Sequence, residues 1–183
     1  RSSPVQIGTL TNWSKIETGA AMKIALKTDG TIWSWGYNNW GVLGDGTTID
    51  RSSPVQIGTL TTWTNVSVGG SSFCYAIKND GTLWSWGYNG DGNIGDGTTI
   101  SRSSPVQVGT LTNWYSISGY ANSATAVKTD ATIWAWGSNQ NGEVGDGTTI
   151  NRSSPVQIGT LSSWPAVGLT TAGTNGSAIL SQG

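Results

Sequence analysis

The sequence lacks the residues on which most catalytic and metal sites depend. It contains no histidine and a single cysteine, Cys74, among 183 residues. Without histidine, neither a Ser/His/Asp triad nor a Cys/His pair can be assembled, and zinc and iron lose their commonest ligands. One cysteine also excludes an intrachain disulfide and a CxxC motif. We therefore expect no catalytic residue, no metal and no cofactor, and we interpret Cys74, which lies in an apolar run, as a small buried hydrophobic residue.

Charge and long apolar runs are scarce as well. Nine Lys and Arg residues face ten Asp and Glu residues, for a net charge of -1. Nucleic acids and anionic membranes recruit clustered Lys and Arg, so this balance argues against both partners. No apolar stretch is long enough to cross a bilayer and no signal peptide is visible. Because Arg1 opens inside a repeat, we expect either that an upstream segment has been removed or that the chain is a piece of a longer array.

What the chain does contain is a fourfold repetition. The segment Arg-Ser-Ser-Pro-Val-Gln, followed by Ile or Val and Gly-Thr-Leu, begins at Arg1, Arg51, Arg102 and Arg152. This spacing defines one array over residues 1–183, with units at 1–50, 51–101 and 102–151 and an incomplete unit at 152–183. Units of this length bury their apolar faces by stacking on their neighbours.

Each unit contains the pattern of four short strands. In the first unit we expect strands at residues 3–8, 13–17, 24–27 and 31–36, with Asp29-Gly30 in the hairpin turn between the last two. The third unit carries Ala131 where the others have glycine, so we expect a left-handed alanine that costs about 1 kcal/mol. The repeated Trp-x-Trp pairs are interpreted as blade packing. The sequence thus predicts an all-β fold, a β-propeller segment of four-stranded antiparallel blades.

The ends of the array predict partial blades. Residues 3–8 read as the outer strand of a blade whose other strands are missing, three complete blades follow, and residues 164–180 read as the first two strands of a fourth. Open sheet edges expose unpaired backbone groups. We therefore expect a protein partner, either further copies of this chain or the rest of a longer propeller, at candidate assembly edges formed by Pro4, Val5, Gln6, Ile7, Ala178, Ile179 and Leu180.

One long string gives the chain a family resemblance. Residues 76–89 read Ala-Ile-Lys-Asn-Asp-Gly-Thr-Leu-Trp-Ser-Trp-Gly-Tyr-Asn, and Gly-x-x-Gly-Asp-Gly-Thr and Ser-Ser-Pro-Val-Gln follow. This pattern resembles the regulator of chromosome condensation repeat. The resemblance implies a propeller, commonly of seven blades, used for nucleotide exchange on a small GTPase, chromatin docking or enzyme inhibition. The near-identity of the Thr- and Asn-rich repeats is similar to amplified bacterial or phage arrays.

The recurring acidic residues are interpreted as turn residues. Asp29, Asp80 and Asp130 occupy the hairpins, and a second set recurs in Gly-Asp-Gly. Repetition at equivalent positions is what turn chemistry predicts and what a single active site does not. The Asn- and Gly-rich segment 89–93 has oxygen side chains spaced as in calcium loops, but it lacks the bidentate glutamate and is interpreted as a plain loop.

Candidate binding residues lie where the units differ, because variable loops on a fixed frame are typical of binding faces. Trp40 is the one tryptophan outside the repeating positions, so it could anchor a protein or a sugar ring, or pack on the neighbouring blade. The candidate binding loops comprise Tyr37, Asn38, Asn39, Trp40, Tyr88, Asn89, Asp91, Asn139, Gln140 and Asn141.

These features favour a non-catalytic structural or protein-interaction module, and not an enzyme. Composition and resemblance suggest an extracellular, cell-surface or virion assembly, with no nucleic acid and no membrane insertion. Two alternatives stay open: a carbohydrate-binding propeller that uses Trp40 to bind a glycan, and a guanine nucleotide exchange factor or enzyme inhibitor.

Overall fold

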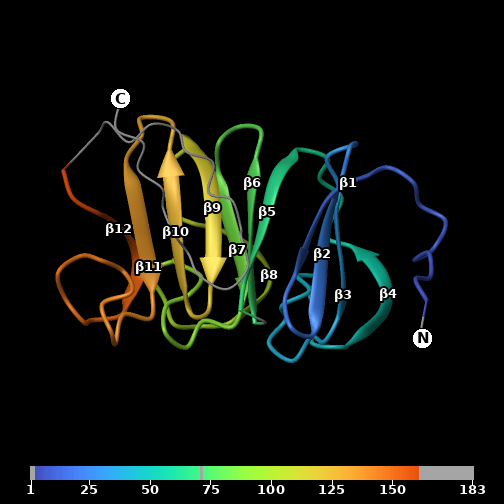
Figure 1. The fold of residues 1–183 in the computed structure, drawn as a ribbon, viewed down its shortest axis with the longest axis horizontal. Helices are drawn as coiled ribbons and strands as arrows, with labels where there is room; N and C mark the ends of the chain where they lie inside the picture. Colours follow the sequence, from blue (N-terminus) through green and yellow to red (C-terminus); the bar gives the residue numbers. More distant parts are fainter. Residues whose placement is uncertain (1–2, 71, 161–183) are drawn as a thin grey trace.

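The computed structural model describes residues 3–70 and 72–160, which form three four-stranded antiparallel sheets (Figure 1). No helix that could cross a membrane occurs in this part of the chain. The strands of the three sheets are β1 (Trp13–Thr18), β2 (Met22–Lys27), β3 (Ile32–Gly36) and β4 (Arg51–Gln56); β5 (Trp63–Gly69), β6 (Phe73–Lys78), β7 (Leu83–Gly87) and β8 (Arg102–Gln107); and β9 (Trp114–Tyr120), β10 (Ser123–Lys128), β11 (Ile133–Gly137) and β12 (Arg152–Gln157).

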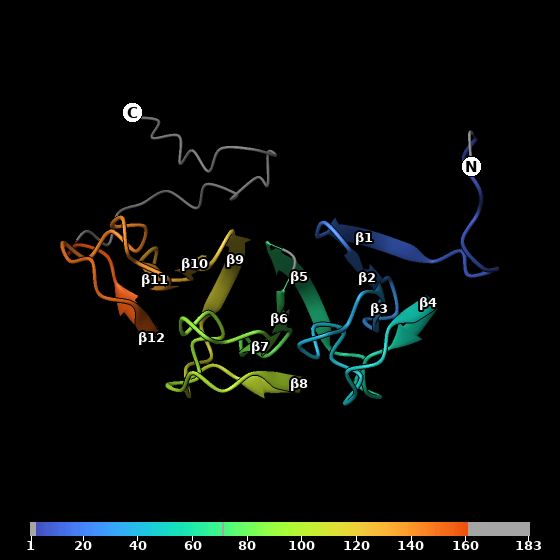
Figure 2. The same cartoon turned by 90° about the horizontal axis from the view of Figure 1, so that it is seen from below.

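Each sheet is one blade and takes its outermost strand from the following sequence unit. Within each blade the spatial order follows the chain order, so β4 of the first blade opens the second unit. Figure 2 shows β1, β5 and β9 on the inner side of the array and β4, β8 and β12 on the outer side. The expectation of three complete antiparallel blades is confirmed.

The hairpin between the second and third strands of each blade is held by a short polar chain. Asp29 Oδ1 accepts hydrogen bonds from the Thr31 amide at 3.0 Å and hydroxyl at 2.6 Å, and Trp33 Nε1 donates to Thr31 Oγ1 at 2.9 Å. The other two blades repeat these bonds. Ala131 has a φ of 61°, close to the 76° of Gly30, which confirms the left-handed alanine.

The hydrophobic core lies between the blades. Trp84 and Trp86 pack in the cluster shared with the first blade, whereas Leu83 belongs to the cluster shared with the third, so both faces of β7 are covered. Trp86 Nε1 also donates to the Val42 carbonyl of the preceding blade at 2.9 Å. Cys74 is fully buried, as expected, and desolvation raises the pKa of its thiol.

A lysine lies between two indole rings in every blade. The Lys78 ammonium is 3.7 Å from the ring centroid of Trp84 and 5.1 Å from that of Trp63. Lys27 and Lys128 occupy the same place in the other blades. Cation–π attraction thus joins the inner strand to the third strand of each sheet.

The predicted strand at residues 3–8 is absent. Its sequence equivalents in β4, β8 and β12 each pair with a Trp-x-Trp-Gly strand, as Trp33 pairs with Gln56. Residues 3–8 have no such partner within the described residues, and a strand needs a ladder partner for its backbone groups. The first of the predicted partial blades is therefore not formed, and the second, at residues 164–180, lies outside the described residues.

Candidate interaction surface

The loops that join the third and fourth strands of each blade gather along one edge of the array, at the bottom of Figure 1. We call this edge the long-loop rim; it comprises residues 37–50, 88–101 and 138–151. The opposite edge carries the short hairpins at 28–31, 79–82 and 129–132, and we call it the hairpin rim. All ten predicted binding-loop residues lie on the long-loop rim.

One buried asparagine organises each long loop. Asn38 is 0% exposed; its Nδ2 donates to the carbonyls of Thr47 and Ile49 at 3.1 Å, and its Oδ1 accepts from the Leu43 amide at 2.9 Å. Asn89 and Asn139 make the equivalent bonds. These three asparagines were predicted as binding residues, and the structure corrects that prediction. Their side chains are fully buried and hydrogen-bonded to the loop backbone, so they offer no surface to a partner.

An aspartate and an arginine close each loop onto the outer strand. Asp45 accepts from the Thr47 amide and hydroxyl with one oxygen and from Arg51 Nε, at 2.8 Å, with the other. Burial raises the pKa of Asp45, but the hydrogen bonds from Thr47 and Arg51 outweigh it and lower the pKa overall. In the third blade the hydrogen bond from Thr148 is the main cause that lowers the pKa of Asp146 to about 2. The repeated aspartates thus hold the loop turns, in agreement with their interpretation as turn residues, and each also pairs with an arginine.

Trp40 is both packed and exposed. Its ring lies edge-on to that of Tyr88 in the next blade, with 5.3 Å between the centroids, yet 50% of its surface remains accessible. Packing on the neighbouring blade is therefore confirmed, and because half of the side chain stays accessible, the anchoring of a partner by Trp40 stays a prediction. Such a partly immobilised aromatic side chain loses little conformational entropy on binding.

The other predicted loop residues differ in exposure. Tyr37, Asn39, Gln140 and Asn141 are exposed, and Asp91 is partly exposed. Asn93, in the segment that resembled a calcium loop, is buried, and its Nδ2 donates to the Asn122 carbonyl at 2.6 Å. No group of metal-ligating side chains is present among the described residues.

Sequence reasoning missed two features of this rim. The same position of each long loop carries an exposed isoleucine: Ile49, Ile100 and Ile150. Because these isoleucines recur in every unit, the sequence suggested that they were structural residues. Asp50 is also exposed, and it differs from its equivalents Ser101 and Asn151. The change of residue type at position 50 was the available sequence evidence.

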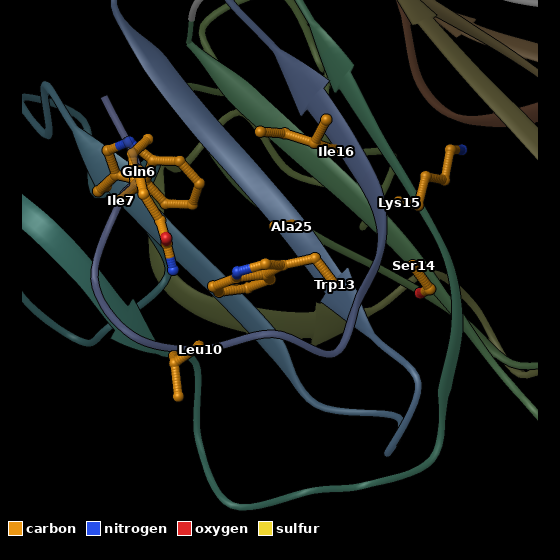
Figure 3. Close-up of a pocket in the computed structure, with 9 residues that line it drawn as sticks. Gln6, Ile7, Leu10, Trp13, Ser14, Lys15, Ile16 and Ala25 are labelled. Atoms are coloured by element: carbon orange, nitrogen blue, oxygen red, sulfur yellow. The ribbon is translucent and has the colours of Figure 1, made fainter. Parts of the chain in front are cut away.

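The predicted assembly edge lies beside an open groove on the first blade. The groove has a volume of about 360 Å³ and is lined by Ile7, Leu10, Trp13 and Ile16, among others (Figure 3). Ile16 is 55% exposed, whereas its equivalent Val66 is 0% exposed because the preceding blade covers it. Pro4, Val5, Gln6 and Ile7 are exposed; Ala178, Ile179 and Leu180 lie outside the described residues.

Four-stranded antiparallel sheets that pack face to face around inner strands define the class of the molecule, a β-propeller segment. Residues 29–76, 80–122 and 130–180 match the model of the regulator of chromosome condensation (RCC1) repeat. The chain therefore belongs to the RCC1 repeat family.

Curated relatives share part of this array. The human E3 ubiquitin-protein ligase HERC2 is 33% identical over 111 residues, which cover 59% of this chain and 2% of HERC2. The ultraviolet-B receptor UVR8 of Arabidopsis thaliana is 28% identical over 96 residues, which cover 52% of this chain and 22% of UVR8. The chain thus spans a small part of the length of these relatives.

Solved structures support the same fold. Prp20p from Saccharomyces cerevisiae, whose structure was described together with its binding to Gsp1p and histones, superposes with a TM-score of 0.74 at 18% identity, over 84% of this chain and 40% of Prp20p. Human WBSCR16 gives a TM-score of 0.71 at 19% identity, over 80% of this chain and 38% of WBSCR16. At these identities the likeness shows the fold.

Proposed function

We propose that this chain is a non-catalytic protein-binding module whose contact surface is the long-loop rim, with Trp40 as its anchor. The observation that carries the proposal is the half-exposed Trp40 indole held against Tyr88. Tryptophan and tyrosine are enriched among the residues that dominate binding energy, and they act from well-packed positions. The loops beneath them are fixed by buried asparagines and ionic clamps, so little ordering is required on binding.

The family supports the class of partner. Prp20p is described in relation to Gsp1p and histones, and yeast RCC1 (Prp20) was solved bound to Kap60. These are partners of Prp20p, and for this chain they favour a protein in general as the ligand.

A displayed peptide library selected on the chain tests the proposal. Trp40→Asn removes the anchor while placing there the residue that Asn141 supplies at the same position of the third blade. Tyr115→Thr is the matched control, because Tyr115 is 54% exposed on β9, outside the long loops, and Thr64 occupies its position in the second blade. We expect enriched peptides to bind the control like the unchanged chain and to lose binding to Trp40→Asn. Equal binding to both variants would refute the proposal.

Self-association and location are further parts of the proposal. The exposed Ile16 and the groove beside it favour contact with a further blade, from another copy or from a longer propeller. The extracellular, cell-surface or virion location stays a prediction from composition and resemblance. The lectin and the exchange-factor or inhibitor alternatives also stay predictions: a glycan array probed with the chain and with Trp40→Asn tests the first, and nucleotide release from small GTPases and β-lactamase inhibition test the second.

A further inference from the structure

Carboxylates are distributed unequally between the two rims. On the hairpin rim, Asp29, Asp80 and Asp130 accept hydrogen bonds from threonines and lie near the lysines of their own blades. The three clamp aspartates pair with arginines, and Glu17 pairs with Lys15 at 3.1 Å. Among the described residues, five carboxylates form no ion pair, namely Asp50, Asp80, Asp91, Asp130 and Glu143. Asp80 and Asp130 are each attracted to the lysine of their own blade, whereas the other three lie one on each long loop. The long-loop rim is therefore the acidic side of the molecule.

Two of these carboxylates lie on the same two loops as the pair formed by the exposed Trp40 and the partly buried Tyr88. Asp50 Oδ1 accepts from the Asn38 amide at 2.8 Å, two residues before Trp40, and its other oxygen remains free. Asp91 lies three residues after Tyr88 in the next loop, and the Tyr88 hydroxyl lies where a side chain on Gly90 would stand. Asp91 Oδ1 accepts from Asn151 Nδ2 of the third blade at 3.2 Å, and its other oxygen remains free. We call Trp40, Asp50, Tyr88 and Asp91 the acidic-aromatic patch.

This combination suits a cationic side chain. A guanidinium or ammonium group is attracted to the face of an indole or phenol ring, and arginine also binds carboxylates through two parallel hydrogen bonds. The fold already uses the same attraction internally, since Lys78 lies 3.7 Å from the Trp84 ring centroid. Lys23, at this end of β2, donates to the carbonyls of Gly19 and Met22 in its own blade and pairs with none of the rim carboxylates.

We propose that the acidic-aromatic patch binds an arginine- or lysine-containing segment of a protein partner. The inference rests on the proposed function and specifies its ligand chemistry. Charge complementarity selects this occupant: the patch offers two carboxylates and two aromatic rings. The third blade provides a natural comparison, because Ser138, Asn141 and Asn151 replace Tyr88, Asp91 and Asp50 at equivalent positions of the same loop.

Binding of two labelled peptides of equal length tests the inference. In one peptide arginine alternates with glycine, and in the other glutamate alternates with glycine. Both are titrated against the unchanged chain, Trp40→Asn, the double variant Asp50→Asn with Asp91→Asn, and the Tyr115→Thr control. The asparagine variants copy residues that the third blade already accommodates, and thermal melts verify that each variant is folded.

We expect the arginine peptide to bind the unchanged chain and the control equally. Trp40→Asn and the double variant should each weaken it about tenfold, which corresponds to about 1.4 kcal/mol. The double variant should also show a weaker dependence on salt, because exposed charge pairs are screened. Equal binding of the glutamate peptide, or arginine-peptide binding that neither variant changes, would overturn the inference. Trp40-dependent library peptides without basic residues would overturn it while leaving the proposed function intact.

Discussion

Two adjacent asparagines have opposite roles on the long-loop rim. Asn38 and Asn39 are adjacent, yet Asn38 is buried at the centre of the loop and Asn39 is exposed. A buried amide must satisfy its donors and acceptors, and Asn38 does so with the carbonyls and the amide of its own loop. Loop shape is thus set by one side chain, and contact with a partner is left to its neighbours.

Removing a buried loop amide should therefore destabilise the fold. Asn89→Ala leaves the Ile94 amide and the carbonyls of Thr98 and Ile100 without their side-chain partner. We expect the free energy of unfolding to fall by about 3 kcal/mol. Denaturant unfolding measures this, with Asn39→Ala as the exposed control, which should change stability by less than about 0.5 kcal/mol. Equal losses in both variants would contradict the assignment.

The hairpin glycines and Ala131 predict opposite effects of small substitutions. Ala131→Gly relieves a left-handed alanine at φ 61° and should stabilise the chain by up to about 1 kcal/mol. Gly81 has a φ of 74°, and the Cβ added by Gly81→Ala would clash with the Thr112 carbonyl oxygen. We expect this variant to lower the free energy of unfolding by about 3 kcal/mol. Thermal melts compare the two. A lower melting temperature for Ala131→Gly would show that the alanine is not strained.

At the scale of the element, each blade is closed by two recurring polar devices. The lysine between two indoles connects the inner strand to the third strand, and the aspartate–arginine clamp fastens the long loop to the outer strand. Both devices recur in all three blades. Each clamp aspartate is held ionised mainly by hydrogen bonds that its own loop supplies, so loop geometry and charge state are coupled.

This coupling predicts acid sensitivity. The folded pKa of Asp146, about 2, lies below its ordinary value of 3.8, so the unfolded chain binds more protons between these values. The stabilisation that ionised Asp146 gives to the folded chain is complete above about pH 4 and is lost as the pH falls toward 2. Unfolding measured from pH 7 to pH 2 should show stability falling in this window, and Asp146→Asn should reduce the fall. An unchanged pH dependence in the variant would contradict this role.

For the whole molecule, the blades differ in what covers them. Val66 and its equivalent Ile117 are buried by a preceding blade, whereas Ile16 of the first blade faces the groove in Figure 3. An apolar sheet face of this kind is stabilised by stacking, which is how the two internal interfaces are built.

We therefore predict that the chain associates at micromolar concentration through this face. Ile16→Thr should shift the measured mass toward the monomer, because it reduces the apolar surface that association would bury. Light scattering over a range of concentrations measures the effect, with Ile150→Thr on the long-loop rim as control. A stable, folded monomer for the unchanged chain would contradict the prediction.

The repeat period, the Asp-Gly hairpins and the Trp-x-Trp spacing determined three antiparallel blades from the sequence alone, because turn chemistry and side-chain alternation are local. The singular Trp40 could also be identified as a candidate contact in this way. Tertiary structure decided which asparagines are buried, that residues 3–8 form no strand, and that Trp40 of one blade packs against Tyr88 of the next. These properties depend on partners from distant segments: a strand requires a neighbouring ladder, and burial requires the next blade.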